Sequence, residues 1–243
     1  MSVLGIDGCK AGWCYYWIEN TKHRFGITDK LASIHELITE AEHVFIDMPI
    51  GLLDGGLCER DCDIGARKVL SDRRKSSVFR VPVRDAVYAS TYEEASHINF
   101  LRTGKKLSKQ SWFLSAKIRE LDEYLRLHSA LIKQVHEAHP ELCFEGLAGK
   151  ALDHRKAMRE GFKERLNLLR RIEPLAESCI ASAWLDHGGY ELQRDDILDA
   201  CILALSARHI SHCRFVPEQA PLDRYGLPMQ ISYLAHNPTD ITA

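Results

Sequence analysis

Two short apolar runs in this chain each end in an Ile-Asp pair. Val3–Ile6 is followed by Asp7, and Val44–Ile46 is followed by Asp47. Short apolar runs bounded by glycine and proline are typical of buried strands. A buried strand that ends in an acidic residue places that carboxylate at the edge of a sheet. The sequence therefore predicts two central strands with acidic groups where they end. The alternative is that each acid is a turn residue, since Asp7 precedes Gly8 and Asp47 precedes Met48-Pro49.

Further acidic residues occur near the C-terminus, where Asp195-Asp196-Ile197-Leu198-Asp199-Ala200 opens an apolar pattern of helical spacing. Asp196 and Asp199 are three residues apart, so on a helix they share a face. Asp195 or Asp196 suits the helix N-terminus, where a carboxylate caps free N–H groups, and we favour Asp195 for this role. Asp199 lies inside the apolar pattern, and a buried acid there needs a partner.

A third strand is predicted to end at Glu137, within Val135-His136-Glu137-Ala138-His139-Pro140. Glu137 is a candidate ligand or general base, and His139 is either a rigid turn residue before Pro140 or a water-positioning group. Clustered carboxylates cannot all stay ionised unless a cation lies among them. Oxygen ligands select hard cations such as Mg²⁺ or Mn²⁺. The acidic residues therefore favour metal-assisted chemistry on a phosphate ester.

Composition is that of an ordinary globular protein, with 45% apolar and 27% charged residues among 243. The length fits one large domain, or a domain with an inserted lobe. The sequence shows no apolar stretch long enough for a membrane span and no signal-peptide pattern. The eight cysteines are scattered, so we expect reduced thiols and a cytoplasmic protein. Cys58 and Cys62 have a zinc-like spacing, but no second pair follows.

Charge is unevenly distributed, although the formal net charge is only −2. The windows 58–84, 102–119 and 154–171 together have a net charge of +15, and the rest of the chain has −17. Such asymmetry fits an anionic partner such as nucleic acid at one face and metal-binding acids at another. The alternative is that these windows are solvated helix faces.

The order of elements follows from hydrophobic periodicity. We expect strands at 2–8, 13–19, 23–28, 44–47 and 132–138, and helices at 31–41, 59–70, 91–103, 112–127, 155–171, 174–186 and 195–209. A cationic loop is expected at 71–77, a basic connector at 104–110, and an extended surface tail after 211.

Several motifs, in order along most of the chain, resemble those of the DUF429 family, which is described as predicted nucleases with an RNase H-like fold. The motifs are Gly5-Ile6-Asp7-Gly8-Cys9-Lys10-Ala11-Gly12-Trp13, Ile46-Asp47-Met48-Pro49-Ile50-Gly51-Leu52, Arg60-Asp61-Cys62-Asp63 with Ala66-Arg67, Arg73 with Ser76-Ser77-Val78-Phe79, Gly104-Lys105 with Leu107-Ser108 and Gln110, Glu137-Ala138-His139-Pro140-Glu141, and Asp195–Ala200.

The resemblance implies an α/β fold with a five-stranded mixed sheet flanked by helices, in a single domain over 1–243. A helical insertion at about 53–131 would separate the fourth and fifth strands. Asp7, Asp47 and Asp196 or Asp199 would hold two Mg²⁺ or Mn²⁺ ions across a scissile phosphate. The spacing of Asp196 and Asp199 is similar to that of the Holliday-junction resolvase branch.

Polar residues of the insertion are the candidates for substrate phosphate, because arginine binds phosphate bidentately. They are Arg60, Arg67, Arg73, Ser76, Ser77, Lys105 and Gln110. A structural role, with Arg73 paired to local acids, is the alternative for this loop.

Three functions are compatible with these patterns. The first is a metal-dependent phosphodiesterase, a nuclease acting on DNA or RNA. The second is a non-nuclease hydrolase or a protein that binds a nucleotide or small phosphate ester on the same scaffold, but Gly8–Gly12 is a poor phosphate loop. The third is a degenerate binding module, which the number of acids disfavours. The sequence makes no prediction of oligomeric state.

Overall fold

The computed structural model describes residues 1–56, 59–189 and 192–235, and the chain forms two compact units. The first unit consists of Met1–Asp47, Lys133–Arg214 and the described residues from Ser232 onward. The second consists of Met48–Ile132 and Phe215–Ile231. The second unit thus contains the predicted insertion at 53–131 together with a segment from near the C-terminus, which the sequence pattern did not associate with it.

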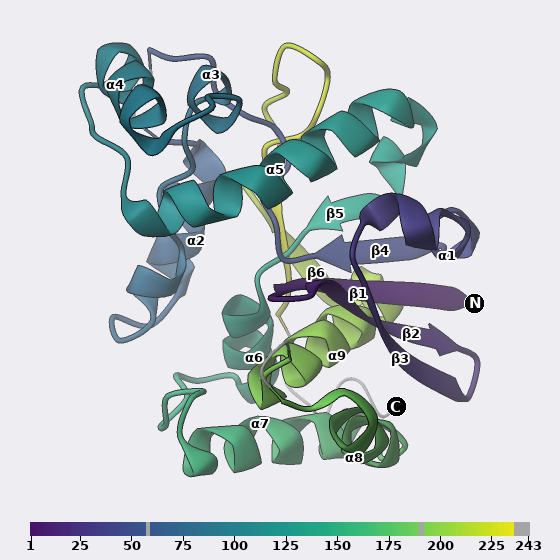
Figure 1. The fold of residues 1–243 in the computed structure, drawn as a ribbon. Helices are drawn as coiled ribbons and strands as arrows, with labels where there is room; N and C mark the ends of the chain where they lie inside the picture. Colours follow the sequence, from purple (N-terminus) through teal and green to yellow (C-terminus); the bar gives the residue numbers. More distant parts are fainter. Residues whose placement is uncertain (57–58, 190–191, 236–243) are drawn as a thin grey trace. The chain divides into compact units, whose positions relative to one another are not determined.

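A five-stranded mixed sheet forms the centre of the first unit (Figure 1), as the sequence predicts. Its strands are β1 (Ser2–Cys9), β2 (Gly12–Glu19), β3 (Lys22–Thr28), β4 (His43–Ile46) and β5 (Val135–Glu137). The strand order is β3-β2-β1-β4-β5. Strands β1, β2 and β3 pair antiparallel, whereas β4 pairs parallel with both β1 and β5. The carboxyl ends of β1, β4 and β5 therefore lie at one edge of the sheet.

Helices flank this sheet. They are η1 (Leu31–Ile34), α1 (His35–Glu40), α6 (Pro140–Ala148), α7 (Arg159–Ile172), α8 (Ala176–His187), α9 (Arg194–Arg208) and η4 (Ile210–His212). The most central is α9, which packs on β1, β2 and β4 and also contacts α6, α7 and α8. From Ile197 to Ala207 every residue of α9 is buried. A helix that is buried on all sides at this length belongs to the core.

Gly5 on β1 allows α9 to approach the sheet closely. A Cβ atom at Gly5 would lie 2.1 Å from the carbonyl oxygen of Ala200 and 2.3 Å from the amide nitrogen of Ala204. Any side chain at this position would force the helix away from the strand. Because side chains at alternate positions of a strand share a face, Asp7 lies on the face of β1 that Gly5 presents to α9.

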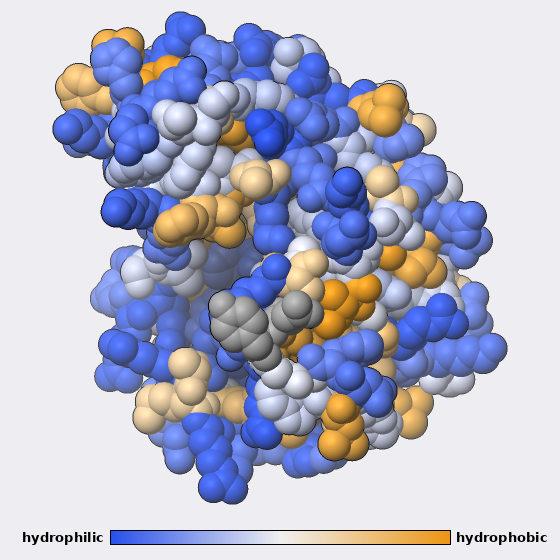
Figure 2. All heavy atoms as spheres, in the orientation of Figure 1, coloured by the Kyte–Doolittle hydropathy of each residue, from blue (hydrophilic) through white to orange (hydrophobic). Residues whose placement is uncertain are grey.

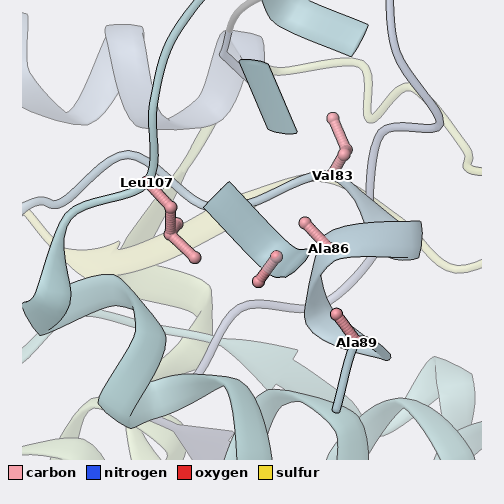
Figure 3. Close-up of a cluster of buried hydrophobic side chains, with 5 residues drawn as sticks. Val83, Ala86, Ala89 and Leu107 are labelled. Atoms are coloured by element: carbon pink, nitrogen blue, oxygen red, sulfur yellow. The ribbon is translucent and has the colours of Figure 1, made fainter. Parts of the chain in front are cut away.

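The second unit is mainly helical. Its elements are α2 (Asp61–Val69), η2 (Lys75–Ser77), α3 (Arg84–Val87), α4 (Tyr92–Thr103), α5 (Lys109–Leu127) and η3 (Ser129–Lys133). The last residue of η3, Lys133, belongs to the first unit. Thr91 and Ser108 cap α4 and α5, accepting from the amides of Glu94 and Ser111 at 3.2 and 3.0 Å. A small buried cluster holds α3, α4 and the segment before α5 together (Figure 3); it consists of Val83, Ala86, Ala89, Ala95 and Leu107.

Several stretches differ from the sequence-based expectation. Helix α5 begins at Lys109 rather than at 112, and Ile132 and Lys133 lie in η3 rather than in the strand expected at 132–138. His139-Pro140 was expected to form a turn but begins α6, because proline is favoured in the first turn of a helix. Helix α7 begins at Arg159 rather than at 155. The tail after 211 was expected to be extended on the surface. Instead β6 (Cys213–Val216) pairs with β7 (Ile231–Leu234), and every residue of β7 is buried.

The surface in view is mostly hydrophilic (Figure 2), and hydrophobic side chains appear there in small separate groups. Each cysteine that the structure describes is a free thiol. Cys58, one of the two cysteines with zinc-like spacing, lies outside the described residues. Among the described helices, none is long and apolar enough to cross a membrane.

Candidate functional site

Asp7 and Asp47 lie side by side at the carboxyl ends of β1 and β4. The parallel register pairs Ile6 with Ile46, and the amide of Asp47 donates to the carbonyl of Ile6 at 2.9 Å. Asp7 is only 7% exposed, and its Oδ1 accepts from the amide of Gly8 at 2.7 Å. The pairs Ile6-Asp7 and Ile46-Asp47 thus reach the same edge of the sheet, because the two strands run parallel with Ile6 opposite Ile46.

Asp199 comes to the same place from α9. It precedes Ala200, whose carbonyl faces Gly5 of β1. The side chain of Asp199 is 2% exposed. It interacts electrostatically with both Asp7 and Asp47, and it affects the pKa of Asp7 more than Asp196 does. The structure therefore brings together two strand-end carboxylates and one helix carboxylate, all within the first unit.

Crowding and burial shift the acid–base properties of these groups. Burial and the neighbouring Asp47 and Asp199 carboxylates raise the pKa of Asp7 well above its ordinary value. Burial raises the pKa of Asp47, although His139 and Lys156 oppose the rise. Burial raises the pKa of Asp199 to about 6 despite the opposing effect of Lys156. Burial therefore opposes the ionisation of each of the three carboxylates, and the described cations beside them offset this effect only in part.

Lys156 is the cation among these acids, and sequence reasoning missed it. Its Nζ atom lies 2.8 Å from Oδ2 of Asp199 and 3.3 Å from Oδ2 of Asp195. The Asp199 carboxylate raises the pKa of Lys156 above its ordinary value, so this lysine is charged. In the sequence it is one of seven basic residues within 154–171. No local pattern separates it from the others, and it was expected inside a helix rather than in the loop before α7.

Asp196 caps α9 instead of joining the cluster directly. Its Oδ2 accepts from the backbone amide of Gln193 at 2.8 Å, and the Gln193 side chain completes a reciprocal capping box. The sequence offered Asp195 or Asp196 for this role and favoured Asp195; the structure gives the role to Asp196, while Asp195 pairs with Lys156. A capping box needs its acidic side chain at the third position of the helix. Because α9 begins at Arg194, that position is Asp196.

Glu137 is not among the carboxylates that converge. The register of β4 and β5 pairs it with Ile46. Neighbouring residues of a strand point to opposite faces, so Glu137 faces away from Asp47. His139, two residues further on, does affect Asp47 electrostatically. Of the two candidates from this segment, the structure places His139 rather than Glu137 beside the acids.

The seven predicted phosphate-binding residues all belong to the second unit. Arg60 is buried and donates to both carboxylate oxygens of Asp63, at 3.1 and 2.6 Å, and to the carbonyls of Ile50 and Gly51. Arg67 pairs with Glu59 and donates to the carbonyl of Val78. Structural contacts therefore occupy both guanidinium groups, contrary to the expectation that they face a substrate.

The remaining five candidates are exposed: Arg73, Ser76, Ser77, Lys105 and Gln110. Ser77 donates to the carbonyl of Arg74 at 2.7 Å. Within the described part of the chain, Arg73 makes no hydrogen bond or ion pair, so the alternative that it pairs with local acids does not hold. Its guanidinium is available to a ligand.

The carboxylates fit a hard cation by donor type, since Mg²⁺ and Mn²⁺ prefer oxygen ligands. Oδ1 of Asp199 is buried and has no hydrogen-bond partner among the described residues, which leaves one oxygen for a ligand. Within residues 1–56, 59–189 and 192–235, no three acidic, histidine or cysteine side chains are arranged closely enough to hold an ion. Lys156 contacts the other oxygen of Asp199.

A model of the family described as "Protein of unknown function (DUF429)" matches residues 5–221, and the chain belongs to this family. No curated protein and no solved structure matches the chain.

Proposed function

We propose that this member of the DUF429 family is a metal-dependent phosphodiesterase that cleaves nucleic acid. The observation on which the proposal depends is the convergence of Asp7, Asp47 and Asp199 in a buried cluster with raised pKa values. Strongly perturbed acids gathered in this way are typical of functional sites rather than of structural ones. Asp196, one turn before Asp199, is a further ligand candidate through its second oxygen.

The strand order supports an RNase H-like assignment. An antiparallel three-stranded meander followed by two parallel strands, with a helix packed across the first strand, is the arrangement that the resemblance implies. In that fold, acids at the ends of the first and fourth strands and on the last helix form the active site. The positions of Asp7, Asp47 and Asp199 agree with this arrangement.

In the proposed reaction, bound Mg²⁺ or Mn²⁺ would activate water and neutralise charge on the phosphate. The chain itself supplies fixed positions for the ligands. The β1–β4 register places Asp7 and Asp47, and the contact of α9 with Gly5 places Asp199. His139 stabilises the ionised form of Asp47, the form needed for a ligand. Exposed Arg73 and Lys105 are candidates for binding the nucleic-acid backbone.

The test is cleavage of labelled DNA and RNA, single-stranded, duplex and branched, by purified protein with Mn²⁺, Mg²⁺, Ca²⁺ or chelator. We expect activity with Mn²⁺ and Mg²⁺ alone, since Ca²⁺ is larger and prefers looser coordination. Asp7→Asn should reduce the rate by at least about 100-fold, because it removes a charged ligand.

Asp186→Asn is the matched control, since Asp186 is an exposed acid on α8. It should retain wild-type activity. Equal cleavage by wild type and Asp7→Asn would indicate a contaminating nuclease and contradict the proposal. Metal binding without cleavage of any nucleic acid would instead favour a small phosphate ester as substrate.

A further inference from the structure

A large aromatic side chain is exposed near the start of α5, in the second unit. Phe113 is 75% exposed, although burial of an aromatic ring is favourable. The opposite face of α5 is buried and includes Ser115 and Ile118, and the adjacent Trp112 packs against the cluster that contains Leu107. Phe113 therefore lies on the solvent side of the helix and contributes little to the packing of this unit.

Lysines flank Phe113 on both sides along the helix. The residues three and four positions away, which are its neighbours on a helix surface, are Lys109, Gln110, Ala116 and Lys117. A helix face that binds an apolar partner needs larger apolar residues at these positions. An aromatic ring between lysines instead fits an anionic ligand that also has flat apolar groups.

Three lysines at the start of α5 and directly before it have no ionic partner. The side chains of Lys105, Lys106 and Lys109 are exposed, and their ammonium groups make no ion pair or hydrogen bond with the described residues. The window 102–119 contains six basic residues and no acid. The positive charge of this segment is therefore not balanced within it, and it is complementary to an anion.

Hydrogen bonds fix the backbone that carries these lysines. The carbonyl of Lys105 accepts from Nδ2 of Asn99 at 2.8 Å, and the side chain of Ser108 caps α5. Oγ of Ser111 donates to the carbonyl of Arg80 at 3.1 Å. A ligand would therefore meet a segment that is already ordered, which lowers the entropic cost of binding.

We propose that Phe113 and these three lysines bind single-stranded nucleic acid, with the lysines on phosphates and the ring of Phe113 stacked on a base. The bases of a single strand can be reached by an aromatic side chain, whereas those of a duplex are stacked inside it. The inference rests on the proposed function for nucleic acid as the ligand. It goes beyond that function by assigning the strandedness and the residues that recognise it.

The test is fluorescence anisotropy with labelled DNA and RNA oligonucleotides, each alone or annealed to its complement, in chelator so that metal-dependent cleavage does not occur. Wild type should bind the single strands more tightly than the duplexes. Phe113→Ala should weaken single-strand binding at least about fivefold, because a base loses its stacking partner, and should leave duplex binding unchanged.

The fold should tolerate Phe113→Ala, since the ring is exposed and alanine suits a helix; a thermal melt checks this. Leu127→Ala is the matched control, because Leu127 is 78% exposed on the same helix. It should bind both forms of nucleic acid as wild type does.

The lysines are tested through salt dependence. Replacing Lys105, Lys106 and Lys109 together by glutamine should reduce the slope of log affinity against log salt by about 2, because each phosphate contact to a single strand contributes about 0.7. Lys150→Gln is the control, since Lys150 is an exposed lysine of the first unit that pairs with Asp153. It should keep the wild-type slope.

Unchanged single-strand affinity in Phe113→Ala would overturn the inference, and so would an equal loss for single strands and duplexes. Tighter binding of the duplexes by wild type, or no binding of any oligonucleotide, would also overturn it. Single-strand binding that depends on Phe113, without cleavage in Mn²⁺, would support this inference while the proposed function fails. Cleavage of duplexes alone, at the same rate in wild type and Phe113→Ala, would do the reverse.

Discussion

Buried acids are treated differently in the two units of this protein. In the second unit each buried arginine has its own acids: Arg84 pairs with Asp122 at 2.6 Å and with Asp223, and Arg60 pairs with Asp63. Arg126 also pairs with Asp122, so the second unit has one arginine for each of these three acids. In the first unit, Asp7, Asp47 and Asp199 have one ion pair among the described residues, from Lys156 to Asp199, and this cluster therefore has a surplus of negative charge when its acids are ionised.

We use this difference to separate the acids that maintain the fold from the acids of the proposed reaction. Around Arg84 most polar groups have partners: Asp122 also accepts from the hydroxyl of Tyr88, and Asp223 accepts from the amides of Tyr225 and Leu227. Only Oδ1 of Asp122 and Nε of Arg84 lack a hydrogen-bond partner in this network among the described residues, and such a network stabilises one conformation. Asp7 and Asp47 make no ion pair with the described residues, which is why we place the proposed reaction at the cluster of Asp7, Asp47 and Asp199.

The largest expected change in stability comes from removing the charge of Arg84, which pairs with Asp122 and Asp223. Arg84→Met leaves Asp122 and Asp223 buried without their cation, so the free energy of unfolding should fall by about 3–5 kcal/mol. Urea denaturation measures it. Arg102→Met is the control, because Arg102 pairs with Asp85 at the surface and should cost at most about 1 kcal/mol. Equal losses in the two variants would contradict the comparison.

A somewhat smaller change in the free energy of unfolding is expected when pH alters the protonation of Asp199. Its pKa of about 6 in the folded protein exceeds its ordinary value of 3.8. Between about pH 4 and 6 the folded state therefore holds a proton that the unfolded state has released. The stability contributed by this proton is present below pH 4 and is lost as pH rises through 6, a change on the order of 3 kcal/mol.

Asp199→Asn lacks this proton equilibrium. In the presence of chelator, the stability of the variant relative to wild type should rise from pH 4 to pH 6, as measured by denaturation at several pH values. Saturating Mn²⁺ should remove the trend, because a bound cation favours the ionised carboxylate. A difference that stays constant across this range would show that Asp199 is paired as fully as Asp63.

A change of opposite sign from Arg84→Met is expected for Asp7→Asn. The substitution keeps the shape of the side chain and removes a charge from a crowded, buried cluster. In metal-free protein the free energy of unfolding should stay the same or rise by up to about 1 kcal/mol. Thermal melts with and without Mn²⁺ provide the measurement. Strong destabilisation of the metal-free variant would mean that Asp7 has a structural role like that of Asp122.

The smallest effect on stability is expected for Arg73→Lys. Arg73 is exposed and makes no ion pair or hydrogen bond with the described residues, so the change in stability should stay within about 0.5 kcal/mol. Binding of nucleic acid should nevertheless weaken, because lysine cannot contact phosphate bidentately. Fluorescence anisotropy with a labelled oligonucleotide in Ca²⁺ measures the affinity. Unchanged affinity would remove Arg73 from the candidate substrate site.

Much of the first unit was predictable from local pattern. Alternating apolar residues and turn residues indicated β1 to β4, and the two Ile-Asp pairs indicated where two parallel strands end. The close approach of α9 to β1 was not predictable, since Gly5 alone does not say which helix covers it. The buried strand β7 was also missed. Its pairing with β6 joins segments that are separated in sequence, and periodicity within one segment does not report on such pairing.

The sequence by itself determined which acids are candidates, because a carboxylate at the end of a buried strand or inside an apolar helix has few structural explanations. It did not determine which cations meet them. Arg84 and Lys156 are both basic residues in basic windows, yet tertiary structure places Arg84 in ion pairs with Asp122 and Asp223 and Lys156 beside Asp199. The physical reason is that the pairing of a long, flexible side chain depends on the position of its backbone. For Lys156 that position is set by Arg165, which donates to Glu141 and to the carbonyl of His154, and by Gly161, which packs against the carbonyl of Arg155.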